Sequence, residues 1–436
     1  MQFKLLLSSL ALLLLYGCGS GSSNHNKAAD TNTLDTAAET AYFTSSEPSE
    51  GPSRPQIAYF DNGNAVAIWL QHSDQELWTN HYSKNTGWGT AGMLQTNSNV
   101  MLGLYQLASN GTSAIATWGE GSTLRASHYD AEAQQWNEPK TIVTEASGNV
   151  DPRIAMNIDG KAVVAWTIGN DIKASYSSAL NTWSAAFPLD NSDTGVYPHD
   201  VAVDASGHAI AVWSQDSKVF SRRYVSGTWG DITTIDDSAD TSNIVLKLDD
   251  AGNAIATWMT IQSDPKTLSY AQYSADADWN TPVLLEDGNL VNQPLLAMNA
   301  DGKAIIVWTT LNTETDVLTY TSRFYSPDTG LGEEETFEVN TNYHYNNSIE
   351  IDSSGNALLV WMYDFDDTNE EEDKAFLLFN QYQAGKGWGT KTELTSIGNA
   401  YGDYDPKLSF NASGEGMMIF GGVSDDGYGI YSRLYQ

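Results

Sequence analysis

A pattern of polar and apolar positions recurs eight times along the chain. Each copy has a polar turn that ends in glycine, followed by a run of Ala, Ile and Val that closes on an aromatic side chain. Glycine supplies the positive φ that a tight hairpin needs, and a run that is apolar at every position predicts a strand buried on both faces. The eight runs end at Trp69, Trp118, Trp166, Trp213, Trp258, Trp308, Trp361 and Phe420.

Three further strands are predicted around each run, so that a copy reads as strands A, B, C and D, with B the apolar run. Strand A precedes the glycine turn. Strand C ends at Tyr82, Tyr129, Tyr176, Tyr224, Tyr273, Tyr325, Tyr382 or Tyr435, and strand D begins in six copies at Trp88, Trp136, Trp183, Trp229, Trp279 or Trp388. The aromatic residues that end strand B lie 45 to 59 residues apart, close to the length of about 40 to 50 residues of a four-stranded propeller blade.

The pattern therefore predicts an all-β chain folded as an eight-bladed β-propeller of four-stranded antiparallel blades. The eighth copy reaches Gln436 directly after its strand C, which would leave an unpaired edge. Residues 37 to 47, around Tyr42 and Phe43, are predicted to supply the missing strand D and close the ring. The propeller domain then spans residues 37 to 436.

This repeat resembles the sialidase-like and WD-repeat-like class of β-propellers. The resemblance covers the chain from about residue 37 onward and concerns architecture alone, because the S-x-D-x-G-x-T-W box of sialidases is absent. A sialidase-like active site also needs three arginines. Five of the seven arginines, namely Arg125, Arg222, Arg223, Arg323 and Arg433, fall in predicted strands C, away from the axis that strands A surround.

The N-terminal segment carries Lys4 and an apolar run from Leu5 to Leu15, which is shorter than the roughly 20 residues of a membrane-spanning helix. The sequence Leu15-Tyr16-Gly17-Cys18 follows, and this box resembles that of bacterial lipoproteins. The resemblance implies a signal peptide over residues 1–17, a fatty-acyl anchor such as palmitate on Cys18, and a flexible tether over residues 18–36. Gly19 favours the outer membrane. The alternative is an ordinary secretory signal with an incidental cysteine.

Charge narrows the possible partners. Against 21 Lys and Arg stand 55 Asp and Glu, a net charge of −34, which repels phosphate backbones and excludes nucleic-acid binding. The seven histidines show no zinc spacing, and no nucleophile or phosphate-loop motif occurs. These observations favour a non-catalytic binding or scaffold protein with a monomeric body. A glycan-active hydrolase or lyase is the alternative, since 55 acids allow a catalytic carboxylate pair.

Loop lengths point to a binding face. The aromatic residues that end strands B and C are separated by 10 to 13 residues in the first four copies and by 15 to 21 in the last four. Long variable loops on a rigid ring are where function concentrates. The candidate ligand-binding residues on this face are Tyr197, His199, Asp200, Tyr343, His344, Tyr345, Tyr401, Tyr404 and Asp405. Such side chains suit a glycan or an envelope protein, although tyrosine at a loop is also a common packing residue.

An acidic run in the longest loop, residues 364 to 373, offers a candidate calcium site. Asp364, Asp366 and Asp367 are the candidate calcium ligands in this run. The run lacks the regular spacing and the central glycine of a dedicated calcium loop. A solvated acidic loop without metal or other cofactor is therefore the favoured interpretation.

Overall fold

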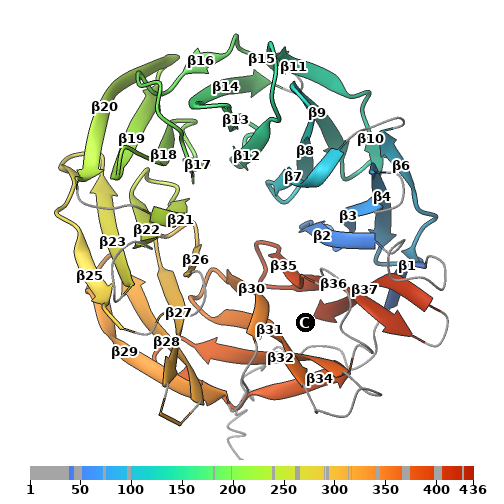
Figure 1. The fold of residues 1–436 in the computed structure, drawn as a ribbon. Coiled ribbons are helices and arrows are strands. Elements are labelled where there is room, and N and C mark those ends of the chain that lie inside the picture. The colour runs from blue at the N-terminus through green and yellow to red at the C-terminus, as the bar shows by residue number, and fades with distance from the viewer. Residues whose placement is uncertain are drawn as a thin grey trace, which may run out of the picture.

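The structure, a computed structural model, describes residues 39–43, 52–71, 75–95, 100–179, 182–197, 199–237, 241–260, 266–288, 290, 294–312, 314–315, 317–339, 344–365, 374–396, 405–424 and 427–436. Within these ranges the chain forms strands and turns, without a helix. Eight antiparallel sheets stand around a common axis (Figure 1). The predicted eight-bladed propeller is confirmed.

Each blade orders its strands A to D from the axis outward. Strands A are β2 (Pro52–Tyr59), β7 (Val100–Ser109), β12 (Asp151–Met156), β17 (His199–Val203), β21 (Thr241–Leu248), β26 (Leu295–Met298), β30 (His344–Ile351) and β35 (Lys407–Phe410). Strands B are β3 (Ala65–Gln71), β8 (Ser113–Glu120), β13 (Ala162–Ile168), β18 (Ala209–Gln215), β22 (Ala254–Thr260), β27 (Ala304–Asn312), β31 (Ala357–Phe365) and β36 (Gly416–Ser424).

The outer half of each blade holds strands C and D. Strands C are β4 (Glu76–Ser83), β9 (Thr123–Asp130), β14 (Asp171–Ala179), β19 (Lys218–Val225), β23 (Thr267–Ser274), β28 (Val317–Ser326), β32 (Lys374–Gln383) and β37 (Gly427–Tyr435). Strand D is continuous in blades 4 and 6, as β20 (Thr228–Asp236) and β29 (Gly330–Val339). In five blades it is split in two: β5 (Gly87–Trp88) and β6 (Gly92–Gln95), β10 (Gln135–Trp136) and β11 (Lys140–Thr144), β15 (Thr182–Trp183) and β16 (Phe187–Pro188), β24 (Asp278–Trp279) and β25 (Val283–Glu286), β33 (Gly387–Trp388) and β34 (Thr392–Ser396).

The core lies between the blades and is built from strands B. All seven tryptophans that end strands B are at most 1% exposed, because a strand with a neighbouring blade on each face has no side open to water. The eight turn glycines before strands B have φ between 77° and 94°, as the sequence predicts. In several turns an Asp or Asn caps the hairpin: Asp249 Oδ1 accepts the backbone N–H of Asn253 at 2.8 Å.

The ring is closed by the N-terminal strand, as predicted. Strand β1 (Glu39–Phe43) pairs antiparallel with β37, with Glu39 opposite Ser432 and Phe43 opposite Gly429. The first and the last of the described strands therefore share the eighth blade, where β1 lies beside β37 in Figure 1. This pairing removes the edge that strand C of the last blade would otherwise expose.

Four of the six tryptophans of strands D, Trp88, Trp136, Trp279 and Trp388, join neighbouring blades by hydrogen bonds. Trp88 Nε1 donates to Ser432 Oγ at 2.8 Å, from blade 1 to blade 8. Trp279 Nε1 donates to Ser221 Oγ at 2.8 Å, and Trp388 Nε1 to Ser322 Oγ at 2.8 Å. In each case the acceptor lies on strand C of the preceding blade. The recurring tryptophan is thus a packing and linking residue between blades.

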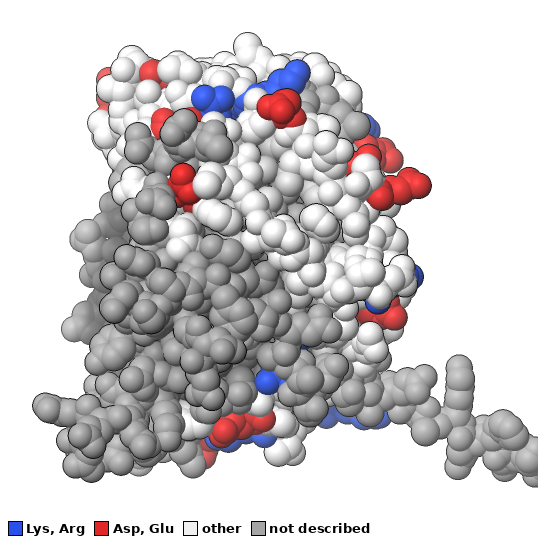
Figure 2. Space-filling view, turned by 90° about the vertical axis from the view of Figure 1, so that its right-hand side faces the viewer, with Lys and Arg blue, Asp and Glu red and all other residues white. Residues whose placement is uncertain are grey.

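Charged side chains on the outer surface are dispersed. On the side seen in Figure 2, basic and acidic residues stand in small mixed groups near the upper and lower edges, and further acidic residues lie along the right-hand edge. No helix in the described part of the chain is long and apolar enough to cross a membrane.

Candidate functional site

The predicted ligand residues around β17 lie in two different environments. Tyr197 precedes β17 and is 65% exposed, whereas His199 begins the strand and is 2% exposed. Burial, and secondarily the charge of Arg153, lower the pKa of His199 to about 3, so the imidazole is neutral in the folded protein. Of these two side chains, only Tyr197 is accessible to a ligand.

Asp200 connects two blades. Its Oδ2 accepts the backbone N–H of Leu246 on β21 at 2.8 Å, and its Oδ1 accepts that of Val201 at 2.8 Å. Burial raises the pKa of this carboxyl, while Lys247, these two hydrogen bonds and Arg153 lower it. Both carboxylate oxygens of Asp200 are therefore engaged in hydrogen bonds to the backbone of the protein.

The remaining predicted residues are mostly outside the described part of the chain. His344 and Tyr345 begin β30 and Asp364 lies near the end of β31, but their side chains are outside the described set. Asp405 precedes β35 and is partly exposed. Tyr343, Tyr401, Tyr404, Asp366 and Asp367 lie outside the described residues, as does Cys18. Within the described ranges, no group of three or more His, Cys, Asp and Glu residues is arranged to hold a metal ion.

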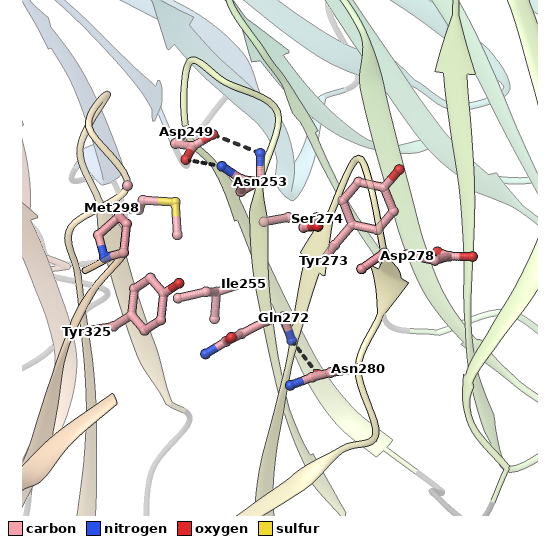
Figure 3. Close-up of a pocket in the computed structure, with 14 residues that line it drawn as sticks. Asp249, Asn253, Ile255, Gln272, Tyr273, Ser274, Asp278, Asn280, Met298 and Tyr325 are labelled. Atoms are coloured by element: carbon pink, nitrogen blue, oxygen red, sulfur yellow. Dashed lines mark hydrogen bonds between the residues drawn. The ribbon is translucent and has the colours of Figure 1, made fainter. Parts of the chain in front are cut away.

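A pocket of about 220 Å³ opens between blades 5 and 6, on the rim formed by the A–B and C–D turns (Figure 3). This rim is opposite to the one that carries the long loops. Blade 6 contributes Met298 and Tyr325 from one side. Blade 5 supplies the other wall, with Asp249, Asn253, Ile255, Gln272, Tyr273, Asp278 and Asn280. We call this cavity the blade 5–6 pocket.

The residue that follows the turn glycine differs between the blades at this rim. The residue after the turn glycine is lysine in blades 3 and 6. There Lys161 Nζ donates to Ser206 O at 3.0 Å and Lys303 Nζ to Ser354 O at 3.2 Å, each crossing to the next blade. Blade 5 has Asn253 at this position, and its Nδ2 turns back to Asp249 Oδ2 at 2.8 Å. The amide of Asn253 therefore bonds within its own blade, as that of Asn356 does in blade 7.

The lining of the pocket combines aromatic faces with hydrogen-bonding groups. Burial raises the pKa of Tyr325, and the nearby Asp249 raises it further. Burial also raises the pKa of Tyr273, an effect that Arg223 opposes. Both phenols therefore keep their protons at neutral pH and can donate hydrogen bonds. The hydroxyl of Tyr325 points toward Ile255 and the middle of the cavity (Figure 3).

A second, more open cavity of about 450 Å³ lies on the other side of Tyr273, between blades 4 and 5. Its lining includes Arg223, Asp231 and Trp279. The guanidinium of Arg223 stands 5.3 Å from the centre of the Tyr273 ring, a cation–π contact. The two cavities therefore flank one tyrosine and the C–D turn of blade 5.

Sequence reasoning missed both cavities because it looked for function in the loops of varying length. Aligning the eight copies on the turn glycine gives no signal for the pocket, because Asn64 and Asn356 occupy the same position as Asn253 in blades 1 and 7.

No family model and no curated protein matches the chain. Among solved structures, the Dos1 propeller is similar with a TM-score of 0.52 and 7% identity, over 91% of this chain and 95% of that one. An ulvan lyase of a new polysaccharide lyase family, bound to a -[GlcA(1-4)Rha3S]- unit, has a TM-score of 0.49 and 11% identity, over 76% of this chain and 91% of the lyase. At such identities the likeness concerns the fold alone.

Proposed function

We propose that the protein is a non-catalytic, glycan-binding lipoprotein of the bacterial outer membrane, held to the membrane by a lipid on Cys18. The observation that carries glycan binding is the blade 5–6 pocket, where Tyr273 and Tyr325 stand beside carboxylate and amide side chains. The ring of the partly exposed Tyr325 offers a flat apolar face to a sugar ring, and the carboxylates and amides offer hydrogen bonds to its hydroxyls.

The size of the pocket supports a small ligand unit. Its volume of about 220 Å³ is below the 300 Å³ or more of pockets that enclose drug-sized molecules. This space suits one sugar residue of a longer chain. An envelope protein as the ligand is less well supported by the same pocket, because stable protein interfaces bury about 800 Å² on each partner.

The alternative, a glycan-active hydrolase or lyase, needs two carboxylates that converge on one substrate. Among the described strands A, Asp200 and Glu350 are carboxylates with perturbed pKa values. Both oxygens of Asp200 accept backbone N–H groups. The blade 5–6 pocket itself is lined by two carboxylates, Asp249 and Asp278, and Asp249 already accepts hydrogen bonds from Asn253.

Filling the pocket tests the proposal. Asn253→Lys places in blade 5 the lysine that, in blades 3 and 6, reaches across to the next blade. The variant should therefore fold and lose the cavity. On a glycan array followed by calorimetry, wild type should bind at least one glycan and Asn253→Lys should lose about tenfold or more in affinity. The matched control is Asn356→Lys, since Asn356 donates to Asp352 in blade 7 as Asn253 does to Asp249.

Two outcomes would reject the proposal. Equal glycan affinity of Asn253→Lys and Asn356→Lys would place binding elsewhere than in the blade 5–6 pocket. Release of new reducing ends or of unsaturated sugars from any glycan that binds would show that the protein is an enzyme.

A further inference from the structure

The blade 5–6 pocket shares a wall with the cavity of about 450 Å³ between blades 4 and 5, which we call the blade 4–5 cavity. Three residues line both spaces. These are Tyr273 at the end of β23, and Ala277 and Asp278 where the chain turns into β24. One tyrosine and one tight turn therefore separate the two cavities, which lie next to each other along the same rim.

The C–D turn of blade 5 presents different side chains to the two cavities. Asp276 and Trp279 line the blade 4–5 cavity but not the pocket, whereas Asn280 lines the pocket but not the cavity. In Figure 3 Asp278 stands on the side of the pocket away from blade 6. A ligand that occupied both spaces would thus run along the rim and cross this turn.

The wall of the blade 4–5 cavity contains a partly exposed indole, that of Trp279. Its Nε1 donates to Ser221 Oγ at 2.8 Å, and its ring centre lies 5.4 Å from that of Tyr273. These two contacts hold the indole in place, so a ligand that stacks on it would not have to immobilise it. A fixed, flat and apolar ring suits one face of a sugar.

Charged side chains of both signs line the same cavity. Arg223 lies with its guanidinium 5.3 Å from the centre of the Tyr273 ring, and its side-chain hydrogen bond to Tyr273 uses one of five N–H donors. Asp231, Asp276 and Asp278 are exposed carboxylates. Within the described ranges, none of these four charged residues takes part in an ion pair. Donors and acceptors for several hydroxyl groups therefore line one cavity.

The balance of charge in this lining disfavours acidic sugars. Three carboxylates against one guanidinium leave an excess of negative charge, in a protein whose net charge is −34. A uronate or a sulfate group would be repelled there. The hydroxyls of an uncharged sugar can instead accept from the guanidinium and donate to the carboxylates.

We propose that the two cavities form one groove that binds two consecutive residues of an uncharged glycan chain. One sugar lies in the blade 5–6 pocket and the next lies in the blade 4–5 cavity against Trp279, so that the glycosidic bond crosses the turn at Ala277. This inference rests on the proposed function, because it extends that site from one sugar to two and sets the charge of the ligand. The second sugar binds without a second loss of translational freedom, so a linked pair gains affinity over a single sugar.

A length series tests the groove. Ligand-observed NMR would measure β-1,4-linked oligosaccharides of glucose, mannose, xylose and N-acetylglucosamine, from the monosaccharide to the tetrasaccharide. In at least one series the affinity should rise about tenfold or more from the monosaccharide to the disaccharide and then level off. Oligogalacturonates of the same lengths should bind at least about tenfold more weakly, because their carboxylates would meet those of the cavity.

Asp276→Ala removes a carboxylate that lines the blade 4–5 cavity but not the pocket. This variant should lower the affinity for the disaccharide toward that for the monosaccharide. The matched control is Asp328→Ala, which removes the carboxylate at the same position in the C–D turn of blade 6. Asp328 lines neither of the two cavities, so the control should bind the disaccharide as wild type does.

Thr233→Gln narrows the blade 4–5 cavity by a second route. Thr233 lies opposite Ser221 in blade 4, as Glu335 lies opposite Ser322 in blade 6. Glu335 reaches the next blade, where its Oε1 accepts the hydroxyl of Tyr382 at 3.3 Å. The new side chain has the length of Glu335 without its charge, so the variant should fold and lose most of the affinity gained from the second sugar.

The possible failures are distinguishable. A disaccharide that binds no more tightly than its monosaccharide, or that binds Asp276→Ala and Thr233→Gln as it binds wild type, would overturn the groove and leave the single-sugar pocket in place. Tighter binding of oligogalacturonates than of every uncharged series, or no binding of any uncharged series, would show that the charge class is wrong. Unchanged monosaccharide affinity in Asn253→Lys would instead reject the proposed function itself.

Discussion

In blades 1, 4 and 7, a side chain at one repeated position of strand A ties the blade to the next. Gln56 Oε1 accepts the backbone N–H of Leu107 at 2.7 Å, and Ser348 Oγ accepts that of Leu408 at 3.2 Å. Asp200 makes the equivalent bond to Leu246. A backbone N–H near the axis that would lack a partner thus receives one from the preceding blade.

This position gives a stability prediction. Asp200→Ala leaves the N–H of Leu246 without its acceptor and should lower the free energy of unfolding by about 1–3 kcal/mol in urea titrations. Tyr197→Ala, three residues earlier and 65% exposed, should change it by less than about 0.5 kcal/mol. Equal stability of the two variants would mean that the Asp200 bond contributes nothing.

Glu350 gives a prediction about pH. Its pKa rises from 4.5 to about 7 on folding, so the folded protein binds the proton more tightly and stability falls as pH rises through this interval. Glu350→Gln removes that dependence. The variant should match wild type at pH 4 and be about 1–2 kcal/mol more stable at pH 8. Thermal melts across this range would measure it, and a variant less stable than wild type at pH 8 would contradict the sign.

At the scale of the element, the sequence predicts strands A, B and C well. Their signals are local: a glycine turn, a run apolar on both faces, and an aromatic at a fixed distance. Strand D is predicted less well, because in five blades it leaves the ladder after its tryptophan. In blade 1 the register shifts opposite Leu77 and Trp78. A bulge of this kind depends on twist and inter-blade packing rather than on periodicity.

The candidate site shows the same division. The sequence predicts Tyr197 and His199 to lie in the same loop and to be equally accessible. In the structure Tyr197 is exposed and His199 is buried. The blade 5–6 pocket is lined by residues of two blades, among them Asn253 and Tyr325. Contacts between residues of different blades are not visible in the pattern of one repeat.

The closing strand β1 gives a prediction at this scale. Deleting residues 19–47 removes β1 and exposes the edge of β37, whereas deleting 19–34 leaves the pairing from Glu39 to Phe43 intact. The larger deletion should lower the melting temperature clearly more than the smaller one. Identical melting curves would show that β1 is dispensable for stability.

At the scale of the whole molecule, the proposed anchor and the propeller are joined through β1. Cys18→Ala should abolish lipid attachment and leave the precursor unprocessed. Fractionation of cells with a radiolabelled fatty acid would measure both. Normal acylation and membrane retention of the variant would reject the lipoprotein proposal, while the propeller itself should fold in either case.

The pairing of β1 with β37 also sets an order of events during folding. The partner of Glu39 is Ser432, so the first strand cannot find its place until nearly the whole chain has been made. Until then β1 remains single, and the eighth blade is the last to be completed. Closing so long a loop costs conformational entropy, and it slows the final step relative to the local hairpins. A ribosome-bound chain that ends before β37 would hold finished hairpins in an open arc, with the closing contact still to be made.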